Sequence, residues 1–276
     1  MTRFRMSIPY TPKPAGRLHV LIRALVTGLM VTAAANFPWQ VFVSANLRTN
    51  PAVPWSVLLM APLMVAYWFY IGGSGWPSRT REFRKFHLRA IPLNGPAWGW
   101  SVFTMVCGFS AALVLLLGVY VRFVPIQGQG FPDTGGVPWY VIASYIGMLS
   151  IVAGVAEEAG YRGYMQSQLE AAFGPFVAIL LCSLLFAATH LSLALAPFYI
   201  LVSMVFGVVA LVTRSVLPCM TGHFGYDLIM TTLEWQYGRP SLRFLSTGWA
   251  LLIAITLILA TLWGIFKLRA VRIRSN

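Results

Sequence analysis

The sequence predicts an all-α membrane protein, with about eight transmembrane helices and a polar site within the membrane. Hydrophobic residues make up 58% of its 276 residues and charged residues only 10%, and its mean hydropathy is +0.72. A soluble domain carries more charge and less apolar surface than this. Because no repeat and no low-complexity linker interrupts the chain, we expect one integral membrane domain over residues 1–276.

The predicted spans are apolar segments long enough to cross about 30 Å of hydrocarbon, which takes about 20 residues. They are 18–45, 54–72, 97–123, 138–156 or beyond, 175–194, 195–213, 216–236 and 247–266. Ser192 and Pro197 divide the stretch 175–213, where we expect a tight turn near 191–197. The first segment could instead be a signal peptide cleaved near Ala33, but an uncleaved helix explains the same residues.

The net charge is +13, and the basic residues cluster at the ends of the apolar segments. This placement indicates membrane topology and contact with anionic lipid headgroups rather than binding of nucleic acid. With the N-terminus inside, sixteen of the twenty basic residues fall on the cytoplasmic side. These are Arg3, Arg5, Lys13, Arg17, Arg23, Arg79, Arg81, Arg84, Lys85, Arg89, Arg162, Arg214, Lys267, Arg269, Arg272 and Arg274. The remaining four are Arg48, Arg122, Arg239 and Arg243. We therefore expect both termini in the cytoplasm.

Two connections have distinctive compositions. The loop 73–96 is basic with Phe83 and Phe86 interleaved, which favours an amphipathic segment at the membrane surface over a regulatory or docking surface. The loop 124–137 is rich in glycine and proline and is typical of a flexible external connection.

Glu157 and Glu158 stand side by side in an apolar run that begins at Val137, although the chain has only seven acidic residues. A carboxylate is costly inside a membrane unless it is paired or functional. Arg162 follows Glu158 by four residues, so one helical turn pairs them. Glu157 points about 100° away and is available for another role.

Two later helices carry further polar residues. His190 follows Phe186 by four residues, and Asp227 follows His223 by four. At 1.5 Å per residue, Glu157 and His190 lie about 20 and 22 Å from the cytoplasmic ends of their helices, and Asp227 about 17 Å. A single histidine is often a satisfied core residue, but this set on three helices predicts a shared site.

The set suits hydrolysis of an amide without a covalent intermediate. A carboxylate and an imidazole can activate water, and a second imidazole with its neighbour can stabilise an oxyanion. A nucleophilic mechanism is less favoured because no Gly-x-Ser-x-Gly is present. Zinc is less favoured because no His-Glu-x-x-His is present, so we expect neither metal nor cofactor. We expect the three cysteines to be small buried hydrophobic residues, because they lack a metal-binding spacing. They are Cys107, Cys182 and Cys219.

The three motifs resemble those of the CAAX protease and bacteriocin-processing family, also called the Abi family, which includes the type II CAAX prenyl endopeptidases. They are Glu157-Glu158-x-x-x-Arg162, Phe186-x-x-x-His190 and His223-x-x-x-Asp227, and the likeness covers roughly 138–236. The resemblance implies a glutamate intramembrane protease in which Glu157 and His190 activate water. It implies further that Glu158 and Arg162 support the site and that His223 and Asp227 bind the oxyanion.

Asp227 departs from the family, whose eukaryotic members have asparagine at this position. An ionised aspartate cannot donate to an oxyanion, so Asp227 is either protonated or orients His223.

The resemblance also implies a membrane-associated protein or peptide substrate, not necessarily a prenylated one, and the plasma membrane of a prokaryote. Glu157, His190 and His223 should then line one cavity open to the cytoplasmic side or to lipid. Two alternatives stay open: a non-catalytic immunity factor or scaffold, and a proton-coupled transporter, for which no inverted repeat is visible.

Overall fold

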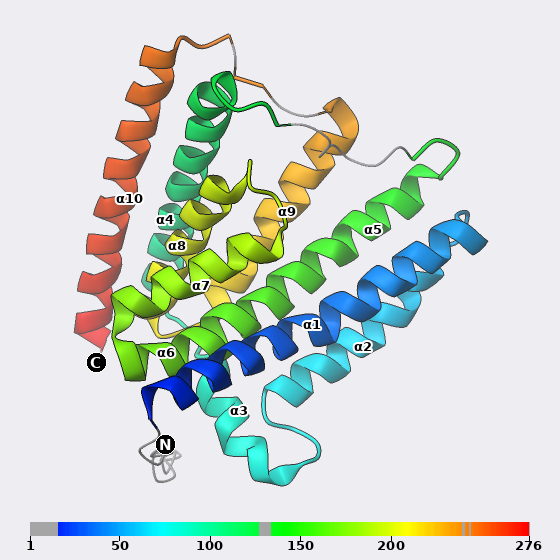
Figure 1. Cartoon of the computed structure of the whole chain (residues 1–276), viewed down its shortest axis with the longest axis vertical. Helices are drawn as coiled ribbons and strands as arrows, with labels where there is room; N and C mark the ends of the chain where they lie inside the picture. Colours follow the sequence, from blue (N-terminus) through cyan, green and yellow to red (C-terminus); the bar gives the residue numbers. More distant parts are fainter. Residues whose placement is uncertain (1–15, 127–133, 239–240, 243, 276) are drawn as a thin grey trace.

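The computed structural model describes residues 16–126, 134–238, 241–242 and 244–275, and over these ranges the chain is helical without any strand (Figure 1). The predicted all-α class is therefore confirmed. The α-helices are α1 (Arg17–Thr49), α2 (Trp55–Ile71), α3 (Arg81–Leu88), α4 (Gly95–Val114), α5 (Trp139–Val152), α6 (Gln166–Phe173), α7 (Pro175–Thr189), α8 (Ala196–Thr213), α9 (Leu217–Tyr237) and α10 (Thr247–Ser275). Two π-helical segments, Ala153–Glu157 and Ala159–Met165, join α5 to α6 in one continuous rod.

Within the described ranges, five rods are long and apolar enough to cross a membrane. They are Arg17–Thr49, Gly95–Arg122, Trp139–Phe173, Ala196–Thr213 and Thr247–Arg272. The apolar helices α2 and α7 are shorter, with 17 and 15 residues, and α9 is not among the five. Each of the eight predicted apolar segments thus coincides with a helical rod. Five of these rods are long and apolar enough to span a membrane.

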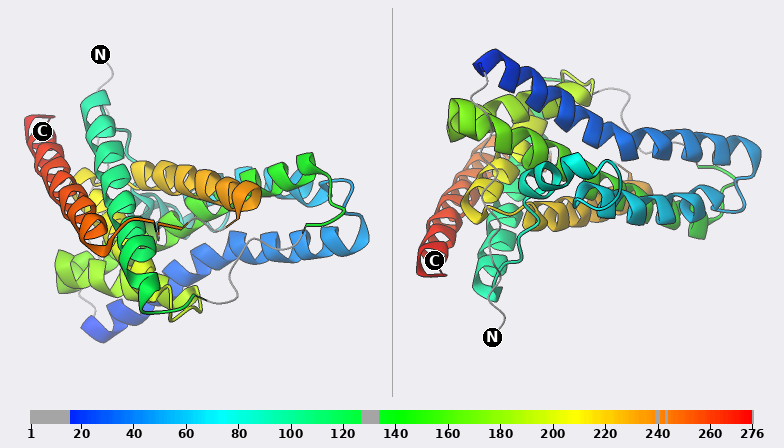
Figure 2. Two further views of the ribbon diagram at one scale, coloured as in Figure 1. Left: turned by 90° about the horizontal axis from the view of Figure 1, so that it is seen from above. Right: turned by 90° about the horizontal axis from the view of Figure 1, so that it is seen from below.

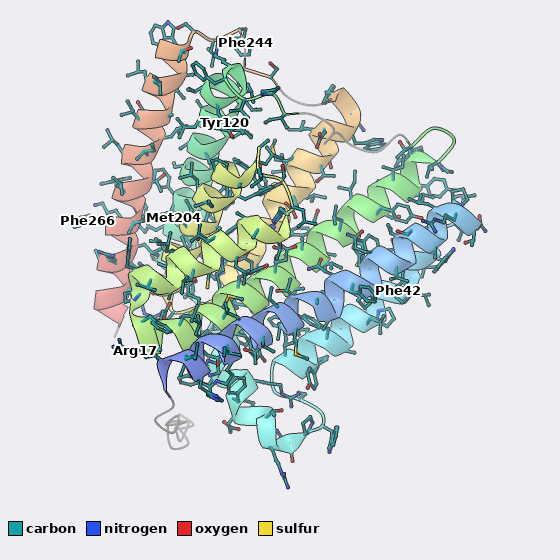
Figure 3. The ribbon with its side chains drawn as sticks, in the orientation of Figure 1. Arg17, Phe42, Tyr120, Met204, Phe244 and Phe266 are labelled. Carbon is teal, nitrogen blue, oxygen red and sulfur yellow. The ribbon has the colours of Figure 1, made fainter. Side chains whose placement is uncertain are left out.

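The outer faces of the bundle are apolar. Phe266 points away from α10 (Figure 3) and is 65% exposed, and Leu58 on α2 is 67% exposed. Large exposed apolar side chains recur along α1, α2 and α10. Contiguous apolar surface of this kind is unfavourable in water and suits contact with lipid.

The rod from α5 to α6 organises the bundle. It packs against α1, α2, α3, α7, α8 and α9, while α10 packs mainly on α4. Figures 1 and 2 show α1, α2 and α5 projecting together from one side of the molecule. The start of α1 and the end of α10 lie at the same end of the molecule (Figure 1).

Several predicted boundaries are corrected by the structure. The helix predicted over 175–194 ends at Thr189, with His190 as its C-cap, and a turn leads to α8 at Ala196. The helix predicted over 97–123 changes to a π-helix at Leu115–Val119. All three cysteines are buried and unpaired, as predicted.

Other predictions fall on connections. The basic loop contains α3, whose Phe86 is 50% exposed while Leu88 is buried. Part of the predicted external loop, 127–133, lies outside the described residues. The same holds for Arg3, Arg5, Lys13, Arg239 and Arg243, and for the side chain of Arg274.

The crossing of α1 with the central rod is unusually close. A Cβ added to Gly160 would lie 2.0 Å from Thr32 Oγ1 and 2.6 Å from the carbonyl oxygen of Gly28. Glycine at such a crossing lets two helix backbones touch. This contact fixes α1 against the segment that bears Glu157 and Glu158.

We expect Gly160→Ala to lower the free energy of unfolding by about 1–3 kcal/mol, because the added methyl group overpacks the crossing. Thermal unfolding of the purified protein in detergent measures the loss. Gly147→Ala is the matched control, since a Cβ at Gly147 on the same rod meets nothing within 4 Å. Equal loss in both variants would contradict the role of the close crossing.

Candidate active site

The two adjacent glutamates lie at the junction of the two π-helical segments. A π-helical turn is rare, and it changes the direction in which successive side chains point. Glycines on this stretch allow close neighbours: a Cβ at Gly154 would lie 2.9 Å from the carbonyl oxygen of Met220 on α9, and Gly160 touches α1. These glycines are the only local signal of the irregular geometry, which the sequence prediction treated as a regular α-helix.

Glu158 is fully buried and has two partners. Its Oε2 lies 3.2 Å from Arg162 Nε, as the spacing of four residues predicts. Its Oε1 lies 2.8 Å from His223 Nδ1 on α9. The structure therefore adds His223 as a partner of Glu158, for which the sequence predicted Arg162 alone.

His223 lies between two carboxylates. Its Nε2 is 3.4 Å from Asp227 Oδ2, one turn further along α9. The imidazole stacks on Phe206, with ring centroids 5.2 Å apart. Both ring nitrogens donate only in the imidazolium form; with a neutral ring, the carboxyl group facing the unprotonated nitrogen, that of Glu158 or Asp227, must be the donor.

Arg162 is buried between aromatic rings. Its guanidinium carbon lies 5.0 Å from the ring centroid of Phe186 and 5.1 Å from that of Phe206. Nη2 donates to Ser203 Oγ over 2.9 Å. Cation–π contacts and hydrogen bonds of this kind compensate the loss of solvent around a buried guanidinium. Phe206 and Ser203 were not predicted, because an aromatic or serine on an apolar helix looks like ordinary core.

His190 stands just after the end of α7. Its Nδ1 lies 2.8 Å from the carbonyl oxygen of Phe186, and a carbonyl oxygen only accepts, so Nδ1 is the donor. In the neutral ring Nε2 is then left as an acceptor. The ring stacks on Tyr199 at a centroid distance of 4.0 Å.

A hydrogen-bonded chain holds this turn to the π-helical segment. Thr189 Oγ1 donates to the carbonyl oxygen of Phe186 over 2.9 Å, so it accepts from Tyr161 OH, also 2.9 Å away. Tyr161 lies on the segment that follows Glu158. The end of α7 with His190 is therefore hydrogen-bonded directly to the segment with the glutamates.

Glu157 is the least engaged group of the cluster. Its Oε2 is buried and has no hydrogen-bond partner among the described residues. The charged groups that act on it are Glu158, Arg162, His223 and Asp227. Within the part of the chain that the structure describes, Glu157 and His190 form no hydrogen bond with each other, and their predicted joint action on a water stays a prediction.

Two cavities lie away from this cluster. A cavity of about 1100 Å³ opens between α1, α3, α6 and α8, and one of about 290 Å³ lies between α1 and α2. Neither is lined by Glu157, His190 or His223. Over the described ranges, no three His, Cys, Asp or Glu side chains lie close enough together to hold a metal ion.

Comparison with known proteins relates this cluster to a family. A family model described as "Type II CAAX prenyl endopeptidase Rce1-like" matches residues 138–229. No curated protein and no solved structure matches the chain. The match runs from the start of α5 into α9 and contains all three motifs. Over residues 138–229 the protein is thus similar to the Rce1-like type II CAAX prenyl endopeptidases, which confirms the resemblance that the motifs predict.

Proposed function

We propose that the protein is an intramembrane endopeptidase that uses a glutamate to activate water against a peptide bond of a membrane-associated protein or peptide. The observation that carries the proposal is the contrast between the two glutamates. Glu158 forms an ion pair with Arg162 and a hydrogen bond with His223, whereas Glu157 beside it forms neither an ion pair nor a hydrogen bond among the described residues and keeps its Oε2 buried. A buried acceptor of this kind suits a general base.

In the proposed mechanism Glu157 takes a proton from water, and the resulting hydroxide adds to the carbonyl carbon of the substrate. The C–N bond then breaks, and the proton passes to the leaving amine. Nε2 of His190, an acceptor in the neutral ring, helps to orient the water. The Tyr161–Thr189 link supports this assignment, because it holds the turn that bears His190 against the glutamate segment.

His223 is proposed to stabilise the oxyanion. Glu158 anchors its Nδ1 at 2.8 Å, whereas the contact of Nε2 with Asp227 is longer, at 3.4 Å. A long contact is easily exchanged for a bond to a developing negative charge. This geometry favours orientation of the His223 ring as the role of Asp227.

The topology proposed with this function has eight spans and both termini in the cytoplasm, in the plasma membrane of a prokaryote, as one domain. It is supported by the start of α1 and the end of α10, which lie at the same end of the bundle.

A scaffold or immunity factor without catalysis is the second candidate. It is favoured by the burial of Glu158 and Arg162, whose bonds connect several helices and would serve a purely structural role equally well. Catalytic tests on Glu157, which makes fewer bonds, separate the two candidates.

We expect Glu157→Gln and Glu157→Ala to lower cleavage of a library of membrane-anchored peptides by about 100-fold or more, because the general base is lost. Mass spectrometry of the products measures cleavage, and thermal unfolding confirms that the variants fold. Glu82→Gln, on the exposed face of α3, is the control for loss of one carboxylate. Parent-like cleavage by both Glu157 variants would exclude Glu157 as the base.

Asp227→Asn should keep activity within about tenfold of the parent and Asp227→Leu should lose considerably more, because asparagine can still accept a hydrogen bond from His223. The rate of peptide cleavage at saturating substrate measures the difference. Equal loss in both variants would show that the negative charge, rather than orientation of His223, is required.

Chelators should leave the cleavage activity largely intact. The proposed base is a carboxylate, so treatment with EDTA or phenanthroline removes nothing on which the reaction depends. Peptide cleavage before and after treatment is the measurement. Loss of activity that returns when zinc is added would replace the glutamate mechanism with a metal-dependent one.

A further inference from the structure

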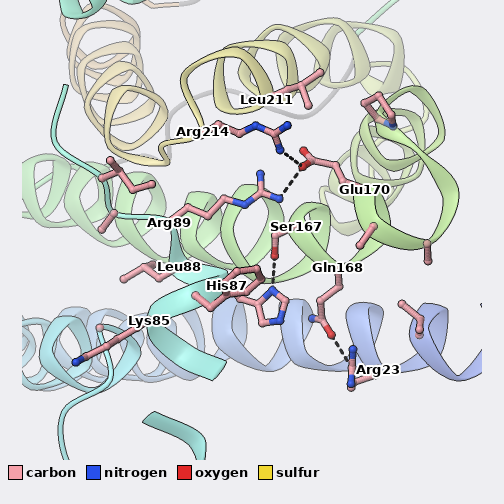
Figure 4. Close-up of a pocket in the computed structure, with 18 of the residues that line it drawn as sticks. Arg23, Lys85, His87, Leu88, Arg89, Ser167, Gln168, Glu170, Leu211 and Arg214 are labelled. Atoms are coloured by element: carbon pink, nitrogen blue, oxygen red, sulfur yellow. Dashed lines mark hydrogen bonds and ion pairs between the residues drawn. The ribbon is translucent and has the colours of Figure 1, made fainter. Parts of the chain in front are cut away.

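The cavity of about 1100 Å³ is strongly basic (Figure 4). It lies between the start of α1, the end of α2, α3, α6 and the end of α8, away from the proposed active site. Among the residues that the structure describes, five cationic side chains line it against a single carboxylate, that of Glu170. The five are Arg17, Arg23, Lys85, Arg89 and Arg214. We call this space the basic cavity.

The one carboxylate is already fully used. Glu170 Oε2 lies 2.6 Å from Arg89 Nη2 and 3.4 Å from Arg214 Nη1. Its Oε1 accepts from Gln166 Nε2 over 2.9 Å. Glu170 therefore cannot neutralise the other three cations, and Nη1 of Arg89 is buried with no hydrogen-bond partner among the described residues.

The two arginines on Glu170 are held in place by the backbone. Arg89 and Arg214 cap α3 and α8 in the left-handed conformation, with φ of 54° and 55°. The carbonyl oxygen of Arg89 accepts from the backbone N–H of Val216 over 3.0 Å. Their guanidiniums approach the same carboxylate from different helices (Figure 4), which positions donors for an anion before it binds.

Burial and the positive charge of the cavity lower the pKa of a histidine in its wall. His87 is 4% exposed, and its Nδ1 lies 2.6 Å from Ser167 Oγ. Burial, followed by the positive charges of Arg23 and Arg89, lowers the pKa of His87 to about 3. The ring is therefore neutral at physiological pH and adds no charge to the cavity.

The cavity also has an apolar side. Phe69 and Phe86 are 59% and 50% exposed at its edge. The other apolar residues of the lining include Val20, Trp68, Ile91, Pro175 and Leu211. A small soluble anion would use only the charged part, whereas an amphiphile would use both parts.

We propose that the basic cavity binds a phosphate group carried by an anionic phospholipid, with the acyl chains along the apolar side. Guanidinium groups match phosphate oxygens in shape and charge, and basic pockets between the ends of transmembrane helices suit anionic headgroups. The cavity has this setting, because α1 and α8, both long and apolar enough to span, contribute to it at their ends. The proposal does not depend on the proteolytic function.

Native mass spectrometry of the purified full-length protein in neutral detergent tests the site. Phosphatidylglycerol is the anionic lipid, phosphatidylcholine with the same chains is the control for lipid charge, and inorganic phosphate is the soluble anion. We expect phosphatidylglycerol to bind at least tenfold more tightly than either of the others. Equal affinity for phosphatidylcholine overturns the proposal, and equal affinity for inorganic phosphate overturns the lipid as the source of the phosphate.

The variant Arg17→Gln/Arg214→Gln locates the site. The side chain of Arg214 is 57% exposed and Arg17 is exposed, so the fold should tolerate their loss. We expect the double variant to bind phosphatidylglycerol at least tenfold more weakly than the parent. Arg79→Gln/Arg81→Gln removes two exposed basic residues that do not line the cavity and should bind as the parent does. Parent-like affinity in the first variant, or equal weakening in both, overturns the proposal.

Discussion

The buried charge of Glu158 is the constraint on which the rest of the structure depends. A carboxylate without solvent must be paired, and loss of one partner of a buried pair costs about 3–5 kcal/mol. Arg162 and His223 supply the pairing at 3.2 and 2.8 Å. Arg162 in turn needs the rings of Phe186 and Phe206, on α7 and α8. One carboxylate thereby fixes four helical rods relative to one another.

This arrangement explains how two adjacent glutamates can have different roles. Because Glu158 takes up the positive charge of Arg162 and an N–H of His223, Glu157 beside it is not tied into an ion pair. The buried, unpaired oxygen of Glu157 is unfavourable for stability. Polar groups that a structure leaves unsatisfied in this way are typical of functional sites, where their cost is offset by neighbouring interactions.

The sequence predicted what depends on local spacing. Apolar length located the helical rods, and the spacing of four residues predicted the contact of Glu158 with Arg162. Contacts between distant segments were beyond such reasoning. Arg89 and Arg214 counted only as topology signals, yet they meet Glu170, which lies 81 and 44 residues away. The π-helical turns likewise lie where glycines bring the rod close to α1 and α9, and the glycines alone do not predict that geometry.

The central rod connects the proposed active site to the basic cavity. Glu158, Arg162, Gln166 and Glu170 follow one another at intervals of four residues, and the first three are almost completely buried. Gln166 donates to Glu170 Oε1 and to the carbonyl oxygen of Gly207 on α8, each over 2.9 Å. Sliding or turning this rod would break the bond of Glu158 to His223 and the ion pairs of Glu170 together. The bond of Glu158 to His223 in the middle of the rod and the ion pairs of Glu170 near its end therefore fix its position, and they hold Glu157 at one depth among its neighbours.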